Sequence, residues 1–237
     1  MISIVITTMK SPDICLKSCL QSIIDHTNLV GDDKEVIVVA NDCTKETLEY
    51  VGALGHPFKM IWSHKPLGFS GANNAGIKQA KGDVIVLLND DIVLLPGQPK
   101  DHWLHLLIEP FLADSSVGMT GAVKFTFDCR GIDREAIAFW CVMIKREVIT
   151  RVGLLDEIFH PYGCEDIDYS IRASNLGYRL VQVPVDNPHR FLVELPRGGF
   201  PIYHMGSKTT DALAGSVENK SAQERRNMNI IYKRYGK

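Results

Sequence analysis

The chain has 237 residues, of which 45% are hydrophobic and 23% are charged, with a formal net charge of −2. This size allows one large domain or two small ones with a well-buried core. The charge gives no reason to expect a nucleic acid partner, and no apolar run approaches the roughly 20 residues of a membrane span.

The cysteines and the first residues bear on the cellular compartment. The six cysteines, at positions 15, 19, 43, 129, 141 and 164, form no C-x-x-C pair. This usage favours a reduced, intracellular protein in which most of them are small core residues. The N-terminal "MISIVITTMKSPD" lacks a basic leader and a small-residue cleavage site, so we expect a cytoplasmic protein.

In the first half, apolar strands alternate with helices. We expect strands at 2–7, 35–40, 59–63 and 83–88. Expected helices run from Pro12 to about His26 and from the cap at Thr44 to about Leu54, and a third, "NNAGIKQAK", follows the small-residue loop "PLGFSGANNAG" and ends at Gly82. This alternation predicts an α/β fold with a mostly parallel central sheet flanked by helices.

Polar residues follow each of these four strands. They are Thr7-Thr8, Asn41-Asp42, Ser63-His64 and Asn89-Asp90-Asp91. Sheets of this kind bind ligands at the carboxyl ends of their strands, where the strand order reverses. We therefore expect all four groups on one rim, beside a bound ligand.

The stretch "GDVIVLLNDDIVLLPG" places Asp90 and Asp91 between two apolar runs. One interpretation is a tight turn that joins two strands, where Asn and Asp are common. The other is a cation site, because buried carboxylates need a partner or a metal and Mg²⁺ or Mn²⁺ prefers oxygen ligands. The motif alone does not choose between them.

The second half has a different character. We expect helices at about 100–112 and 146–153, a strand "AIAFWCVMI", a helix that Gly177 ends, a strand at 179–184 and a C-terminal helix at about 221–235. Residues 1–98 then form a nucleotide-binding half and residues 99–237 an acceptor-binding half. Since the two halves are expected to share a core, we treat them as a single domain.

Two candidate sites lie in this second half. In "GCEDIDYSIR", Glu165, Asp166 and Asp168 cluster where a helix begins. They either cap the helix, whose dipole favours negative charge, or repel one another enough to raise one pKa into the range of a useful base. His204, in "YHMGSKT", is a lone histidine, which is more often structural than a ligand.

Taken in order, these motifs resemble the GT-A-fold glycosyltransferases of family 2, and most closely their rhamnosyltransferase-like members. The resemblance rests on "IVITT", "EVIVVANDCTKET", "PLGFSGANNAGI", "GDVIVLLNDDIVLLPG", "VGLLDEIFHPYGCEDIDYSIRASNLGYR" and "YHMGS". It extends from Ile2 to about Ser207. Each motif is weak by itself, whereas the ordered set is specific.

The resemblance implies a role for each candidate residue. Asp91 would coordinate the metal, with His204 as a further metal ligand or diphosphate contact. Asp166, in its acidic pair with Glu165, would be the catalytic base. The nucleotide sugar would contact a set of residues around the strand ends: Thr7, Thr8, Gly68, Asn73, Asn74, Asn89 and Asp90.

The sequence departs from the family pattern at two positions. Ala40 stands where the family has an aspartate after the second strand, so Asn41 or Asp42 would substitute for it. Pro66 or a neighbour replaces the usual asparagine before the "GF" loop. Neither change touches the expected chemistry, but the first leaves the identity of the nucleotide open.

The implied function is inverting, metal-dependent sugar transfer. A UDP-, dTDP- or GDP-sugar would donate to a hydroxyl of a glycan, lipid-linked or protein acceptor, with Mn²⁺ or Mg²⁺, as in polysaccharide biosynthesis. One alternative is a sugar-nucleotide-binding protein without turnover. Another is a nucleotidyltransferase, which "TTMKSPD" disfavours because it has one lysine and no glycine for a triphosphate loop.

Further features concern the acceptor. Aromatic residues near the expected base either contact sugars or pack in the core: Phe139, Trp140, His160 and Tyr162. The segments 127–138 and 185–201 are expected to shape the acceptor site. The basic C-terminal helix "QERRNMNIIYKRYGK" either packs on its own domain or makes a peripheral contact with an anionic membrane.

Overall fold

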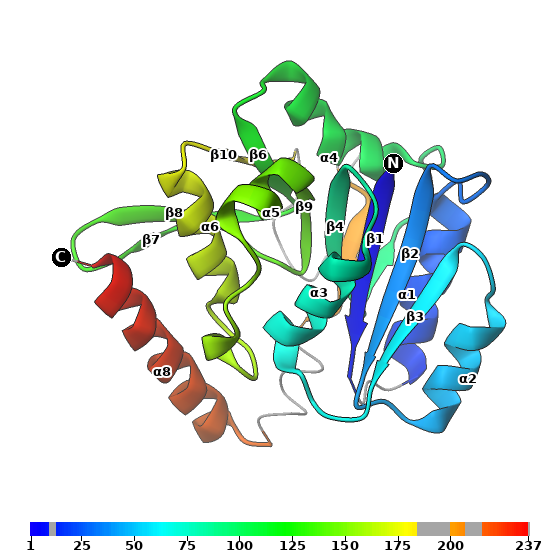
Figure 1. The fold of residues 1–237 in the computed structure, drawn as a ribbon, viewed down its shortest axis with the longest axis horizontal. Coiled ribbons are helices and arrows are strands. Elements are labelled where there is room, and N and C mark those ends of the chain that lie inside the picture. Colours follow the sequence, from blue (N-terminus) through cyan, green and yellow to red (C-terminus); the bar gives the residue numbers. More distant parts are fainter. Residues whose placement is uncertain (10–12, 184–199, 207–214, 237) are drawn as a thin grey trace.

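The computed structural model describes residues 1–9, 13–183, 200–206 and 215–236. Within these ranges a seven-stranded sheet has the order β10-β6-β9-β4-β1-β2-β3 (Figure 1). Its strands are β1 (Ile2–Thr8), β2 (Lys34–Asn41), β3 (Phe58–Ser63), β4 (Val84–Asn89), β6 (Val117–Gly121), β9 (Cys141–Lys145) and β10 (Arg179–Gln182). Only β9 among them runs antiparallel to its neighbours, β4 and β6. The predicted mostly parallel sheet is confirmed, and both halves of the chain contribute strands to it.

Helices cover both faces of this sheet, because successive residues of a strand point to opposite sides. On β1, Ile4 and Ile6 belong to one core and Val5 to the other, and all three are fully buried. The first core includes side chains of α1 (Asp13–His26), α2 (Lys45–Ala53) and α4 (His102–Ala113). The second includes α3 (Gly68–Gln79), α5 (Arg146–Val152) and α6 (Glu165–Asn175).

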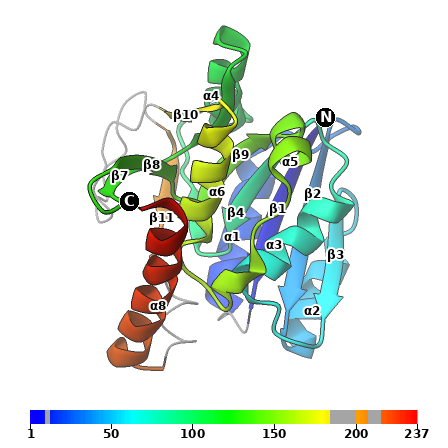
Figure 2. The same cartoon turned by 60° about the vertical axis from the view of Figure 1, so that its left-hand side comes forward.

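Smaller elements extend the fold beyond the main sheet. Strand β5 (Ile92–Leu94) pairs antiparallel with β11 (Ile202–His204), and β7 (Lys124–Asp128) forms an antiparallel pair with β8 (Asp133–Ile137). A short 3₁₀ helix, η1 (Glu157–Phe159), precedes α6. The C-terminal helix α8 (Val217–Tyr235) lies beside α6, as Figure 2 shows. There Ile231 packs with Ile167 and Ile171 in a third, smaller core.

The predicted strand "AIAFWCVMI" is wrong as a single element. Its first residues belong to β8 and its last to β9, which lie in different sheets. The chain turns at Phe139 and Trp140, where the Trp140 carbonyl accepts a hydrogen bond from the Asn89 N–H at 3.0 Å. Because both strands are apolar, the pattern contains no signal for the break.

The helix after the small-residue loop starts earlier than predicted, at Gly68 instead of Asn73. The small residues are needed for close packing of α3 on the sheet. A Cβ at Gly76 would lie 2.3 Å from Cγ1 of Val5 in β1. A composition that indicates a loop therefore belongs here to a helix pressed against β1 and β2.

The C-terminal helix begins at Val217, four residues before the predicted start, with Ser216 as its N-cap. Its apolar side chains Met228, Ile231, Tyr232 and Tyr235 pack on the third core. They are therefore used within the domain, as one of the two interpretations expected. Among the helices that the structure describes, none has the length and apolarity needed to cross a membrane.

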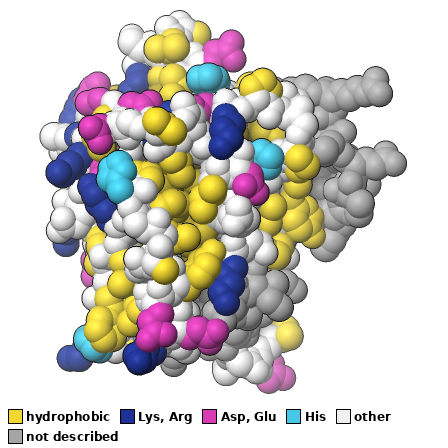
Figure 3. All heavy atoms as spheres, turned by 90° about the vertical axis from the view of Figure 1, so that its right-hand side faces the viewer, with side chains coloured by type: hydrophobic (Ala, Val, Ile, Leu, Met, Phe, Trp, Pro, Cys, Tyr) yellow, Lys and Arg dark blue, Asp and Glu magenta, His cyan; other side chains and the backbone are white. Residues whose placement is uncertain are grey.

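The edge strand β3 leaves apolar side chains on the surface. Met60 is 40% exposed and Trp62 is 47% exposed. Figure 3 shows hydrophobic side chains gathered along the middle of the face that carries this edge of the sheet. This face is distinct from the rim at the carboxyl ends of the strands.

Candidate active site

The carboxyl ends of β1, β2 and β4 surround a small hollow beside the start of α3. In the strand register Thr7 lies opposite Asn89, and Thr8 lies opposite Ala40. The hollow has a volume of about 70 Å³. Its lining includes six residues predicted to bind the nucleotide sugar: Thr7, Thr8, Asn41, Gly68, Asn89 and Asp90.

Asp90 is oriented by a short hydrogen bond from the first strand. The hydroxyl of Thr8 donates to Oδ2 of Asp90 at 2.6 Å, and both residues are buried. Asp90 and Asp91 form the turn between β4 and β5, so the expected turn is present. However, β5 pairs with β11 and not with β4. The turn therefore carries both carboxylates from the main sheet toward the segment that contains His204.

Asp91 and His204 approach each other at this turn. Oδ1 of Asp91 lies 3.1 Å from Nε2 of His204, and the two side chains are only 4% and 11% exposed. The Met205 N–H donates to the Asp91 carbonyl at 2.8 Å, which fixes β11 against the turn. Nε2 of His204 is buried and makes no hydrogen bond of acceptable geometry.

This pair fits a divalent ion. Adjacent ligands of an octahedral ion with bonds of about 2.1 Å stand about 3 Å apart, which matches the observed separation. Carboxylate oxygen and imidazole nitrogen both suit Mn²⁺. Among the described residues, no group of three or more His, Cys, Asp or Glu side chains is arranged to hold an ion. Two protein ligands would thus need substrate oxygens and water to complete the shell.

Trp140 orients His204 from the side. The two rings stack with centroids 4.8 Å apart and planes 7° from parallel. The next residue toward the N-terminus, Phe139, gives its backbone N–H to the carboxylate of Asp166. The turn at 139–140 therefore connects the Asp91–His204 pair with the acidic pair at the start of α6.

Burial changes the acidity of that acidic pair. It raises the pKa of Glu165 to about 8, and the neighbouring Asp166 carboxylate adds to this shift. Burial also raises the pKa of Asp166 to about 6, although the Ile167 and Phe139 N–H groups stabilise its ionised form. Near neutral pH the proton is therefore held on Glu165, while Asp166 is ionised. Separation of two pKa values in this way is typical of acid–base sites.

Asp168 has a different role from its two neighbours. It is fully buried and accepts hydrogen bonds from Arg172 at 2.7 Å, Arg234 at 2.9 Å and the Tyr235 hydroxyl at 2.6 Å. Its charge is compensated by two guanidinium groups. The predicted crowding of three like charges is therefore only a secondary cause of the raised pKa values, and burial is the first.

Comparison with known proteins identifies the family. A sequence model of glycosyl transferase family 2 matches residues 3–165. The chain belongs to this family. Two solved glycosyltransferases show the same GT-A fold: a mannosyltransferase from Pyrobaculum calidifontis, in complex with GDP-Man and Mn²⁺, and GalNAc-T7, with UDP, GalNAc and Mn²⁺. Their TM-scores are 0.61 and 0.63, at 20% and 18% identity; each covers 77% of this chain, which covers 54% and 42% of them.

Two curated relatives are much longer than this chain. The uncharacterized protein y4gI of Sinorhizobium fredii (strain NBRC 101917 / NGR234) is 23% identical over 216 residues, which are 78% of this chain and 24% of that protein. The O-antigen biosynthesis protein RfbC of Myxococcus xanthus is 25% identical over 213 residues, 76% of this chain and 16% of that protein. This family 2 chain thus spans a quarter or less of either relative.

Asn41 and Asp42 occupy the region where the family aspartate is replaced by the buried Ala40. Oδ1 of Asn41 accepts the Leu67 N–H at 2.7 Å, so this side chain supports the start of α3 while it lines the hollow. Asp42 has a left-handed backbone (φ 56°), and its N–H donates to the Ser63 carbonyl at 2.9 Å. Asp42 is not among the residues that line the hollow.

Gly68 is required where α3 meets the loop before α6. Its φ is 67°, and a Cβ there would lie 2.5 Å from Nδ1 of His160 and 2.8 Å from the Pro161 carbonyl oxygen. The adjacent Phe69 N–H donates to that same oxygen at 2.7 Å. Pro161 and Tyr162 thereby become a wall of the hollow, which the sequence did not indicate for Pro161.

Asn73 and Asn74 do not line the hollow, contrary to the prediction. Both are buried within α3. Asn73 donates to the Phe69 carbonyl one turn earlier, and Asn74 donates to the Leu155 carbonyl and accepts the Leu155 N–H. These bonds hold α3 against the segment before η1. The structure therefore gives both asparagines a supporting role.

The aromatic residues near the acidic pair divide between the two interpretations. Phe139 is buried and packs edge-on against Tyr169, with centroids 5.8 Å apart, so it is a core residue. Tyr162 lines the hollow, and His160 is exposed beside it. The segment 127–138 is formed by β7, β8 and their turn, whereas most of the predicted acceptor segment 185–201 lies outside the described residues.

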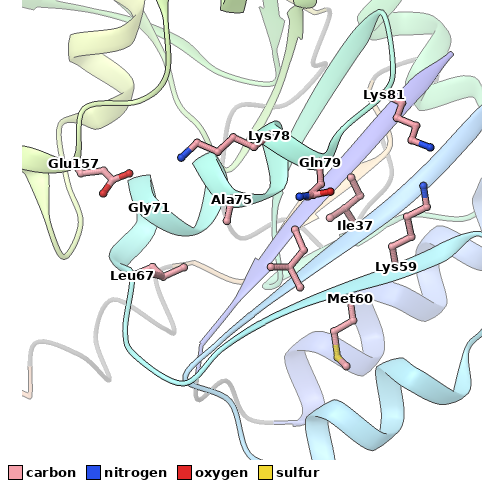
Figure 4. A pocket seen from close by; sticks show the side chains of 11 residues that line it. Ile37, Lys59, Met60, Leu67, Gly71, Ala75, Lys78, Gln79, Lys81 and Glu157 are labelled. Carbon is pink, nitrogen blue, oxygen red and sulfur yellow. The ribbon is translucent and has the colours of Figure 1, made fainter.

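A larger groove lies away from this rim. It has a volume of about 830 Å³ and runs between α3 and strands β2 and β3, as Figure 4 shows. Lys59, one of its lysines, binds the buried Glu35 at 2.6 Å. None of the predicted site residues lines this groove. Size alone therefore does not locate the chemistry, whereas the convergent polar groups at the rim do.

Proposed function

We propose that this family 2 protein is a metal-dependent, inverting glycosyltransferase that moves a sugar from a nucleoside diphosphate to an acceptor hydroxyl. The observation that carries the proposal is the Asp91–His204 pair at the strand-end rim. It is connected through Trp140 and Phe139 to Asp166, whose pKa is raised to about 6. One end of this arrangement suits a diphosphate, and the other suits a proton acceptor.

The donor would bind along the rim. The hollow is far smaller than the roughly 300 Å³ of a small ligand pocket, so a nucleotide sugar would extend from it toward the Asp90–Asp91 turn. Asp91 and His204 would hold Mn²⁺ or Mg²⁺ against the diphosphate. Such an ion supplies electrostatic stabilisation of the negative charge that develops on the leaving group. Asp90, oriented by Thr8, would contact the ribose or the donor sugar.

Asp166 would act on the acceptor. As an ionised carboxylate it takes the proton of the acceptor hydroxyl while that oxygen forms its bond to the anomeric carbon. The bond from this carbon to the diphosphate oxygen breaks on the opposite face, and the configuration is inverted. Glu165, which is protonated near neutral pH, keeps a second negative charge away from Asp166.

The substrates and the location are proposed more broadly. UDP-, dTDP- and GDP-sugars are the candidate donors, and the solved structures of similar fold contain GDP-Man or UDP. The resemblance to an O-antigen biosynthesis protein favours a glycan or lipid-linked acceptor in polysaccharide synthesis. We propose a cytoplasmic, single-domain unit. Any peripheral membrane contact would use the exposed basic residues of α8, such as Arg225 and Lys233.

Donor hydrolysis tests this function without a known acceptor. Wild-type protein is incubated with UDP-, GDP- and dTDP-sugars and Mn²⁺, and release of the nucleoside diphosphate is measured. We expect release from at least one donor, its loss on chelation of the metal, and its loss in Asp91→Asn. Binding of a nucleotide sugar with no release and no transfer to any glycan acceptor would instead support the inactive binding protein.

A further inference from the structure

The C-terminal helix α8 reaches the loop that forms one wall of the hollow. Its Asn227 is fully buried, although asparagine is a polar residue. The Nδ2 group of Asn227 donates to three backbone carbonyls of this loop, those of Phe159 at 3.2 Å, Tyr162 at 2.9 Å and Gly163 at 2.8 Å. One side chain thus fixes the whole loop between η1 and α6.

Two neighbours on α8 reinforce this contact from the surface. Gln223 donates to the His160 carbonyl at 3.1 Å and lies 3.5 Å from the Tyr162 carbonyl. Arg226 donates to the Ile158 carbonyl at 3.3 Å. Together, residues 223, 226 and 227 supply donors to carbonyls all along the loop 158–163. Buried carbonyls without partners are costly, so these contacts select one conformation of the loop.

The loop needs such support because its last residues are strained. Gly163 and Cys164 both have left-handed backbones, with φ values of 97° and 69°, immediately before Glu165. A non-glycine residue in this region costs on the order of 1 kcal/mol or more, and it persists only where the surroundings impose it. The bond from Asn227 to the Gly163 carbonyl is at this point. It therefore bears on where Asp166 stands.

The opposite side of the loop contacts the donor hollow. The Phe69 N–H donates to the Pro161 carbonyl at 2.7 Å, and Pro161 and Tyr162 line the hollow. The loop is thus held between α3 and α8, with the hollow on one side and the acidic pair at its end. A shift of this loop would change both together.

We propose that Asn227 is a positioning residue for the transfer reaction. It acts through the loop 158–163, and it sets the wall of the donor hollow and the placement of Asp166 at once. This inference rests on the proposed function of the site. It assigns to α8, whose sequence indicates only an amphipathic basic helix, a part in the active site.

The test compares substitutions on the same helix. Asn227→Asp keeps the shape but removes the N–H donors, and Gln223→Ala removes the surface contacts at little risk to folding. Ile231→Ala is the matched control, since Ile231 is equally buried on α8 and packs in the third core. Each variant is measured for hydrogen exchange in residues 158–163, for donor KM and kcat, and for Tm.

Asn227→Asp is expected to speed exchange in the loop, to raise the donor KM and to lower kcat/KM at least about tenfold, because misplacement by about 1 Å has effects of this size. Gln223→Ala should show a smaller change in the same direction. Ile231→Ala should lower Tm while its kinetics stay within about twofold of wild type. If Ile231→Ala reduces kcat/KM as much as the Asn227 and Gln223 variants do, α8 is only structural and the inference is wrong.

Loop exchange separates this inference from the proposed function. If wild-type protein shows no donor turnover, the function fails, whereas faster exchange at 158–163 in Asn227→Asp would still establish the contact. If wild-type turnover is present and both the Asn227 and Gln223 variants match it in exchange and kinetics, the positioning role is excluded. Should Asn227→Asp not fold, Gln223→Ala decides, because its two contacts lie at the surface.

Discussion

The indole of Trp140 lies flat on the imidazole of His204, with ring centroids 4.8 Å apart and planes 7° from parallel. Trp140 is at the turn that also gives the Phe139 N–H to Asp166. The stacking fixes the ring that places Nε2 3.1 Å from Asp91. A surface contact of two rings thus links the expected ion ligands to the expected base.

Removal of this stacking should weaken metal use before it affects folding. Trp140→Leu is expected to raise the Mn²⁺ concentration for half-maximal turnover several-fold, because His204 loses the ring that orients it. Trp140→Phe, which retains an aromatic face, should change it less. Trp62→Leu is the control, since Trp62 is exposed on β3. An unchanged Mn²⁺ requirement in Trp140→Leu would show that the stacking does not orient a ligand.

The two acidic residues at the start of α6 should respond differently to amide substitution. Asp166→Asn removes the proposed base and is expected to lower transfer about 10²- to 10⁴-fold. Glu165→Gln replaces a carboxyl that is already neutral near pH 7 and should retain activity within about tenfold. The measurement is kcat for both variants beside donor binding. A greater loss in Glu165→Gln than in Asp166→Asn would reverse the assignment.

The raised pKa values predict two pH effects. Because Asp166 must be ionised, kcat/KM should fall as the pH drops below about 6. Folding stability has the opposite dependence: the pKa of Glu165 is raised from 4.5 to about 8, so the folded state binds this proton more tightly than the unfolded state. The free energy of unfolding therefore decreases as the pH rises through this window.

Glu165→Gln removes that dependence. Near pH 8 the variant should be more stable than wild type by roughly 1–3 kcal/mol, since each unit of pKa shift corresponds to about 1.4 kcal/mol. The advantage should vanish at pH 4, where the wild-type carboxyl is protonated in both states. Denaturant unfolding at the two pH values measures the difference. A gain that is equal at both would mean that Glu165 is not shifted.

Gly68 should tolerate no side chain. Gly68→Ala combines a left-handed backbone (φ 67°) with overlap against His160 and Pro161, and we expect a loss of stability of about 1–3 kcal/mol together with weaker donor binding. Gly52→Ala in α2 is the matched control, because nothing lies within 4 Å of its Cβ position and its φ is not positive. That variant should be neutral or slightly more stable in thermal unfolding. Equal effects of the two substitutions would contradict the close approach at Gly68.

The sequence predicted the strand-end rim because continuous apolar strands show where they end. Thr7, Asn41 and Asn89 lie where that pattern placed them, around one hollow. The break between β8 and β9 had no such signal, because both strands are apolar and the change of sheet depends on pairing with residues far along the chain. The resemblance also assigned Asn73 and Asn74 to the nucleotide, whereas their bonds hold α3 in place.

Asn227 was not predicted for a related reason. Its only sequence signal is an asparagine between Met228 and Arg226 on a helix whose apolar residues recur at helical spacing. Which carbonyls it meets depends on how α8 packs beside α6, and Arg234 and Tyr235 set that packing through Asp168. Such long-range contacts leave no periodic pattern.

Metal-linked nucleotide binding tests the central claim most directly. UDP, GDP and dTDP are each added with and without Mn²⁺ to wild type, Asp91→Asn and Asp166→Asn, and the shift in Tm is recorded. We expect at least one nucleotide to stabilise wild type and Asp166→Asn only when Mn²⁺ is present, and none to do so for Asp91→Asn. No manganese-dependent shift with any nucleotide in wild type, or an undiminished shift in Asp91→Asn, would contradict this account.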